Sequence, residues 1–95
     1  MEPSALTQSE ISELHKEIPA WTVLEDLKMI SREFKFKNFA EAIIFAAKIA
    51  QLAEEENHHP DLHVSWGKVK VELSTHSVGG LSEKDFILAA RIDTL

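Results

Sequence analysis

The sequence contains no cysteine and only three glycines among its 95 residues. Without cysteine the chain can form no disulfide, no thiolate nucleophile and no cysteine-based zinc or iron–sulfur site. Only two of the glycines are adjacent, so the chain has no glycine-rich phosphate loop, and it also lacks a G-x-S-x-G nucleophile elbow. These absences disfavour nucleophilic catalysis and are compatible with folding in a reducing cytoplasm.

Long apolar runs and an excess of basic residues are also missing. No apolar stretch approaches the roughly 18 residues of a membrane-spanning helix, and residues 1–4 lack the basic-then-apolar pattern of a signal peptide. Ten Lys and Arg against 16 Asp and Glu give a formal net charge of −6, whereas nucleic-acid binding depends on clustered basic side chains. We therefore expect a cytoplasmic protein that binds neither membranes nor, directly, nucleic acids.

The length indicates a single domain over residues 1–95, and 44% hydrophobic content is enough to supply its core. Helical and alternating apolar spacings, together with three capping pairs, predict seven elements. The capping pairs are Thr7 with Glu10, Asn38 with Glu41, and Ser82 with Asp85. The expected elements are helices over residues 8–18, 39–56 and 83–93, and strands over 21–24, 29–37, 62–66 and 69–73.

The order α-β-β-α-β-β-α has no parallel β-α-β regularity, so it predicts an α+β fold: a four-stranded antiparallel sheet with helices packed on one face. The other face of the sheet would then need water or a partner. In the helix over 39–56, helical spacing assigns the core face to Phe39, Ala42, Ile43, Ala46, Ile49, Ala50 and Ala53. Arg32 interrupts an apolar strand face, so we expect it near the sheet edge or paired with an acid.

Three glutamates, Glu54 to Glu56, close the same helix. Anions at this end of a helix oppose its dipole by a few tenths of a kcal/mol or more. For Glu55 and Glu56 a solvated surface is the simpler interpretation.

Three of the five histidines lie at the predicted exits of a helix and a strand. His58 and His59 leave the long helix just before Pro60, which disfavours helical angles in the residue before it. His76 ends the second strand of the hairpin that Pro60 introduces. Imidazole is the side chain whose ordinary pKa lies nearest neutrality, so three of them together would form a site that gives and takes protons.

Two simpler interpretations compete with this site. A single histidine is more often structural than catalytic, and His15 and His63 are interpreted in that way. Zinc could use His58, His59, His63 and His76 as ligands. However, adjacent histidines are poor joint ligands, and the HExxH pattern is absent. We therefore expect acid/base chemistry without a metal.

The spaced motif extends beyond the histidines. It reads Glu54-x3-His58-His59-Pro60-x5-Trp66-x9-His76-x8-Asp85. In this form it resembles the signature of the pterin-4a-carbinolamine dehydratases. Further similar segments are Trp21, Phe36-x2-Phe39-x2-Ala42, Ser74-Thr75-His76 and Gly80-Leu81-Ser82. The resemblance therefore covers nearly the whole chain.

The resemblance implies dehydration of a 4a-hydroxytetrahydropterin, such as 4a-hydroxytetrahydrobiopterin, to the quinonoid dihydropterin plus water. This step recycles tetrahydrobiopterin after aromatic amino-acid hydroxylation, and it requires no cofactor. By resemblance, His58 and His76 are the acids that protonate the departing hydroxyl from opposite sides. His59 binds substrate with an auxiliary proton role, and Glu54 orients an imidazole or stabilises its charged form.

The substrate-binding residues that the resemblance implies are Asn57, His58, His59, Pro60, Ser74, Thr75, His76 and Ser77. Three positions depart from the family pattern: Asn57 and Ser77 stand where acidic residues are often found, and His63 stands where an aromatic or apolar residue is common. The resemblance also implies a homodimer or homotetramer and a functional link to an aromatic amino-acid hydroxylase. The alternative is a non-catalytic binding module that acts as an assembly or regulatory partner, like the vertebrate members that serve as dimerisation cofactors of a homeodomain transcription factor.

Overall fold

The computed structural model describes residues 4–24 and 26–95, and these form the predicted α+β fold. Four strands make one antiparallel sheet in the order β1-β2-β4-β3. The elements are α1 (Gln8–His15), β1 (Thr22–Val23), β2 (Ile30–Lys35), α2 (Phe39–Glu56), β3 (Asp61–Ser65), β4 (Lys68–Leu73), the 3₁₀ helix η1 (His76–Val78) and α3 (Glu83–Ile92). The predicted order and both hairpins are confirmed.

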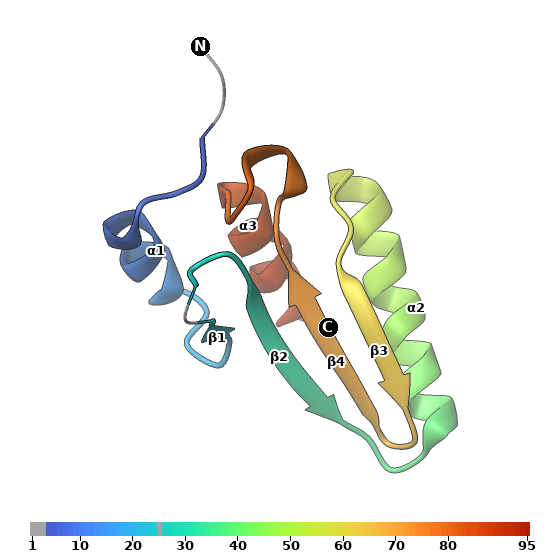
Figure 1. Ribbon diagram of the computed structural model, residues 1–95. Helices are drawn as coiled ribbons and strands as arrows, with labels where there is room; N and C mark the ends of the chain where they lie inside the picture. The colour runs from blue at the N-terminus through green and yellow to red at the C-terminus, as the bar shows by residue number, and fades with distance from the viewer. Residues whose placement is uncertain (1–3, 25) are drawn as a thin grey trace.

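Helices α2 and α3 run behind the strands, while α1 lies beyond the β1 edge (Figure 1). Strand β4 occupies the middle of this layer, and its inward side chains Val69, Val71 and Leu73 are fully buried. Ile49 of α2 and Leu88 of α3 are buried in the same core. The core therefore lies between the sheet and these two helices, which fixes the ends of α2, β4 and α3 relative to one another.

The hairpin of β3 and β4 turns at Gly67, whose φ of 69° favours glycine. A Cβ atom there would lie 2.9 Å from the carbonyl oxygen of Phe36, and the amide of Phe36 donates to the carbonyl of Gly67 at 2.8 Å. The turn thereby fixes the register, in which Asp61 pairs with Glu72 at the far end of the hairpin.

The predicted helix starts are confirmed. Thr7 and Glu10 form a reciprocal capping box at α1. The side chain of Asn38 accepts from the amide of Glu41 at 2.8 Å. These local hydrogen bonds satisfy amides that have no partner within the helix.

Four residues do not lie where the sequence predicted them. Trp66 lies in the turn rather than in β3, and it is 75% exposed. Phe39, Ile43 and Ala50 of α2 are exposed rather than buried, because the core-facing side of α2 is defined by Ala42, Phe45, Ile49, Leu52 and Ala53. Helix α2 is apolar on more than one side, so periodicity alone could not select the side that packs.

Arg32 is paired with an acidic residue, which was one of the two alternatives predicted for it. Its guanidinium lies 2.7 Å from the carboxylate of Asp93, and the indole N–H of Trp21 donates to the same oxygen at 2.8 Å. Asp93 caps the C-terminal end of α3. These contacts join β2 and the segment before β1 to the end of α3.

The glutamates at the end of α2 contact α3 rather than only solvent. Arg91 of α3 donates to Glu55 at 2.8 Å and to Glu56 at 3.3 Å. The hydrogen bond from Arg91 holds the pKa of the Glu55 carboxyl below its ordinary value, and the same bond raises the pKa of Arg91. Glu55 and Glu56 are therefore not simply a solvated surface: their ion pairs with Arg91 join α2 to α3.

The sheet face opposite the helices is polar. On β2 and β4, for example, Glu33 pairs in register with Lys70, and Lys35 with Lys68. On β3, His63 lies 2.6 Å from Glu72. This face can therefore be covered by water alone. Among the described residues, no helix is both long and apolar enough to cross a membrane.

Candidate functional site

Two loops meet at the end of the sheet opposite the Gly67 turn. One loop leads from α2 into β3 and carries His58 and His59. The other leads from β4 to α3 and carries Thr75 and His76 (Figure 1). The antiparallel register brings them to the same end, since the last β3–β4 pair is Asp61 with Glu72. The predicted site residues are thus brought to one end of the sheet.

Asn57 sets the direction in which the first loop leaves α2. It caps the helix in the left-handed conformation, with φ 50° and ψ 42°. Asparagine tolerates this conformation better than most non-glycine residues. The amide of His58 then donates to the carbonyl of Ala53 at 3.1 Å, so the backbone of His58 is fixed directly after the helix. Asn57, predicted as a substrate contact, serves here as a helix cap.

His58 is bonded to a buried carboxylate. Its Nε2 lies 2.5 Å from Oδ1 of Asp85 in α3. The side chain of His58 is 11% exposed, and that of Asp85 is fully buried. A buried carboxylate is costly unless it is fully hydrogen-bonded, so the other partners of Asp85 decide whether this arrangement is stable.

Oδ2 of Asp85 has two further donors. The hydroxyl of Thr75 donates to it at 2.8 Å, and the amide of Ser82 donates at 3.0 Å. The hydroxyl of Ser82 lies 2.7 Å from that of Thr75, and it can donate there because the Thr75 proton is already directed at Asp85. Asp85 therefore accepts as a carboxylate, and His58 donates through Nε2–H. This leaves Nδ1 of His58 as the nitrogen available to exchange a proton.

His59 forms a second imidazole–carboxylate pair, with Glu54 in the last turns of α2. Here both side chains are open to solvent, at 58% and 76% exposure. They line a cavity of about 380 Å³ together with Pro60, Leu62 and two alanines of α2. The imidazole that Glu54 contacts is that of His59.

His76 begins η1 instead of ending a strand, because β4 stops at Leu73. The backbone of Thr75 closes the loop on Gly80, with amide-to-carbonyl distances of 2.7 and 3.4 Å. His76 is exposed and lines a cavity of about 230 Å³, to which Ser74 also contributes. This cavity and the one beside His59 have no lining residue in common.

The remaining predicted contacts have different surroundings. Ser77 lines a separate cavity with the first turn of α3. The side chain of Thr75 is buried on Asp85, so it supports His58 rather than facing a ligand. His15 bonds to the carbonyl of Trp21 at 2.6 Å, and His63 bonds to Glu72. The structural interpretation of these two histidines agrees with their contacts.

Asp85 ends the spaced motif, but sequence reasoning gave it only a local role, as the third helical position after the Ser82 cap. Its membership of the motif was the one signal of its contact with His58, 27 positions away. Within the described residues, no three or more His, Asp or Glu side chains are grouped so that they could hold a metal ion.

Comparison with known proteins gives a consistent result. The sequence profile of the family described as "Pterin 4 alpha carbinolamine dehydratase" matches residues 4–95. A protein of Alkaliphilus metalliredigens, provisionally named as a pterin-4-alpha-carbinolamine dehydratase, is 55% identical over 83 residues, which cover 87% of this chain and 71% of that protein. A protein of Methylococcus capsulatus with the same provisional name is 43% identical over 95% of this chain and 79% of its own length.

Two solved structures share the fold. A transcriptional coactivator/pterin dehydratase from Brucella melitensis is 35% identical with a TM-score of 0.88, covering 96% of this chain and 97% of that chain. A pterin dehydratase-like protein identified as a RuBisCO assembly factor in the alpha-carboxysome is 25% identical with a TM-score of 0.67. It covers 79% of this chain and 87% of its own.

Proposed function

Because the chain belongs to the pterin-4a-carbinolamine dehydratase family, we propose that it dehydrates 4a-hydroxytetrahydrobiopterin in the cytoplasm, as a step of tetrahydrobiopterin recycling. One proton is added to the C4a hydroxyl, and the C–O bond breaks with its electron pair leaving on water. N5 gives up its proton, and the electron pair of that bond forms the C4a=N5 double bond of the quinonoid dihydropterin. One proton is gained and one is lost, so no cofactor is needed.

The observation that carries the proposal is the bond between His58 and the buried Asp85. An imidazole fixed in one tautomer by a carboxylate is the usual way in which proteins hold a general acid or base. The side chains of Asp85, Thr75 and Ser82 do not contact the substrate in this mechanism; they position His58. The proposed acid is the Nδ1 position of His58.

His76 is the proposed second acid, acting from the opposite side of the pterin, and His59 binds the substrate with Glu54 behind it. Exposure suits these roles, since His76 and His59 each line a cavity. Ser74, the backbone of Thr75, and Pro60 complete the proposed binding surface. Asn57 and Ser77 are proposed to lie at its edge.

The direct test is turnover of a synthetic 4a-carbinolamine, followed by the absorbance of the quinonoid product. We expect turnover by the purified protein, at the same rate after treatment with a chelator. Asp61→Asn is a suitable control, because Asp61 is an exposed carboxylate at the same end of the sheet. Absence of turnover above the uncatalysed rate would contradict the proposal, and a zinc-reversible loss after chelation would contradict the metal-free mechanism.

A second candidate function rests on the exposed apolar face of α2. Phe39, Ile43 and Ile44 on this helix are each between 44% and 57% exposed, and natural proteins seldom leave such a face uncovered. We propose that this face mediates assembly into a homodimer or homotetramer. The alternative is that it acts as a binding module for another protein, such as an aromatic amino-acid hydroxylase that supplies the substrate. The two structural relatives, one described as a transcriptional coactivator and the other as an assembly factor, are compatible with partner binding.

Sedimentation of the purified chain separates these possibilities. Self-assembly predicts a dimer or tetramer at micromolar concentration, and Ile44→Lys on the exposed face should shift it towards the monomer. Lys48→Ala, on an exposed position of the same helix, is the control. A wild-type monomer that still turns over the carbinolamine would overturn the assembly proposal and leave the dehydratase proposal intact.

A further inference from the structure

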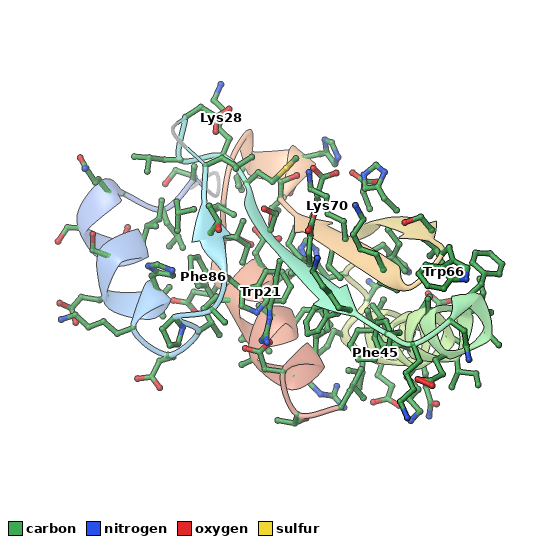
Figure 2. The ribbon with its side chains drawn as sticks, turned by 90° about the horizontal axis from the view of Figure 1, so that it is seen from below. Trp21, Lys28, Phe45, Trp66, Lys70 and Phe86 are labelled. Carbon is green, nitrogen blue, oxygen red and sulfur yellow. The ribbon has the colours of Figure 1, made fainter. Side chains whose placement is uncertain are left out.

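The cavity beside His76 extends away from the other two histidines, towards the turn between β1 and β2. Its wall on that side consists of Leu24, Asp26, Lys28 and Met29. The stem of Lys28 also approaches the loop that carries η1: its Cγ lies 4.0 Å from the position that a Cβ on Gly80 would take. Figure 2 shows Lys28 on this turn. The sequence motif includes none of these four residues.

Backbone hydrogen bonds join the described residues of the turn that carries Asp26 and Lys28. The amide of Leu24 donates to the carbonyl of Met29 at 3.0 Å, and the amide of Leu27 donates to the carbonyl of Leu24 at 2.8 Å. Leu27 has a φ of 59°, a left-handed conformation that is unfavourable for a non-glycine residue. Its side chain packs against the core. Such strain persists where the surrounding structure enforces it, and it is concentrated at functional sites.

Charged and hydrogen-bonding groups converge at the cavity. Oδ1 of Asp26 accepts the backbone amide of Lys28 at 3.0 Å, which orients the carboxylate. His15, His58, His59 and His63 each have a hydrogen-bond partner. For His76 the described part of the chain supplies none. One histidine without a partner, one acidic residue and one lysine, namely His76, Asp26 and Lys28, therefore line the same small cavity.

The size and chemistry of the space indicate which part of a ligand it accepts. Cavities for whole ligands measure roughly 300–1,000 Å³, whereas this one measures about 230 Å³, so it suits a substituent rather than the bicyclic ring. Leu24 and Met29 offer apolar walls for a short carbon chain. Asp26 and Lys28 offer an acceptor and a donor for hydroxyl groups along it.

The pyrimidine edge of a pterin fits the cavity less well. That edge presents two parallel N–H donors, which are best matched by both oxygens of one free carboxylate. One oxygen of Asp26 is already occupied by the amide of Lys28. A hydroxyl group donates one hydrogen bond and can accept others, so it does not need both oxygens of the carboxylate.

We propose that this cavity is the subsite for the C6 substituent of the pterin, and that it selects a short hydroxylated side chain. The inference rests on the proposed function for the identity of the ring. C6 and C4a are both bonded to N5, so a ring with its C4a hydroxyl at His76 directs its C6 substituent into a cavity that adjoins the same imidazole.

Calorimetric titration of two unreactive 7,8-dihydropterins tests the proposal. One compound carries a dihydroxypropyl group at C6, and the other carries a methyl group. The wild-type protein should bind the hydroxylated compound more tightly, by about tenfold if one hydrogen bond to a charged group is gained. In Lys28→Ala and Asp26→Asn the ratio of the two Kd values should fall towards one. Lys37→Ala, an exposed lysine just beyond β2 at the other end of the sheet, should keep the wild-type ratio.

Each other result would overturn the subsite in a recognisable way. Equal Kd values for the two compounds in the wild-type protein would show that the cavity does not select the substituent, while pterin binding stands. An equal loss of affinity for both compounds in Lys28→Ala would show that the cavity binds the pterin ring rather than its C6 substituent. If neither compound binds, the pterin assignment itself fails, and the subsite fails with it. Circular dichroism of each variant establishes that it is folded.

Discussion

Two adjacent histidines form the same kind of pair in opposite surroundings. His58 meets Asp85 in the interior, with 11% and 0% of the two side chains exposed, whereas His59 meets Glu54 at the surface, with 58% and 76% exposed. An exposed ion pair is worth about 0–1 kcal/mol, because water screens it and two mobile side chains must be ordered. A buried, fully hydrogen-bonded carboxylate holds its partner in one geometry. This difference in burial supports the proposed roles, in which His58 acts as an acid and His59 binds the substrate.

The buried pair should show the largest response to mutation. In Asp85→Asn one acceptor oxygen is replaced by an NH₂ group, which cannot accept a hydrogen bond. Directed at His58, this group meets the Nε2–H donor; directed at Thr75 and Ser82, it leaves both of those donors without an acceptor. We expect a loss of about 1–3 kcal/mol in the free energy of unfolding and a fall of about 10²-fold or more in kcat. Urea denaturation and steady-state kinetics measure the two effects. Wild-type kcat in a folded variant would show that Asp85 serves the fold alone.

The exposed pair should respond through binding. His59→Ala should raise KM more than it lowers kcat, as expected for a residue that binds the ground state and the transition state equally. Glu54→Gln should lower kcat less than Asp85→Asn does. It should also change the free energy of unfolding by no more than about 0.5 kcal/mol. A fall in kcat for His59→Ala as large as that of His58→Ala would remove the distinction between the two histidines.

A third carboxylate contact, between Glu55 and Arg91, should give the smallest effect, and one that depends on pH. Arg91 lowers the pKa of Glu55 in the folded protein. The contribution of this contact to stability is therefore present above the pKa that Glu55 has in the unfolded chain, and it is lost as the pH falls through the pKa of Glu55 in the folded protein. Arg91→Gln should therefore destabilise the protein at pH 7, and the difference from wild type should shrink at about pH 3. Denaturation at both pH values checks this, and a difference that grows on acidification would contradict it.

The same contrast explains what the sequence could predict. Local patterns determined the strands, the capping boxes of α1 and α3, and the Gly67 turn, because each depends on residues a few positions apart. The histidines were found because their side-chain chemistry is distinctive and Pro60 marks the loop. These signals predict that His58, His59 and His76 come together, and the register of β3 with β4 shows at which end of the sheet.

Long-range pairings could not be predicted in this way. The contacts of Asp85 with His58 and of Arg91 with Glu55 join segments far apart in the sequence, and each of the two acids had a sufficient local explanation. The choice of packed face on α2 was also ambiguous, because Ile43 and Ile49 are equally apolar. Tertiary packing decided that Ile49 is buried and Ile43 exposed.

The central claim is that His58 and His76 are acids addressing opposite faces of the pterin. The most direct measurement is the turnover of each C4a stereoisomer of the carbinolamine by His58→Ala, His76→Ala and the double variant. Each single variant should lose about 10²–10⁴-fold in kcat for one isomer only, and the double variant should lose nearly all activity on both. Equal losses for both isomers in each single variant would show that the histidines form one proton relay, and would contradict the assignment to opposite faces.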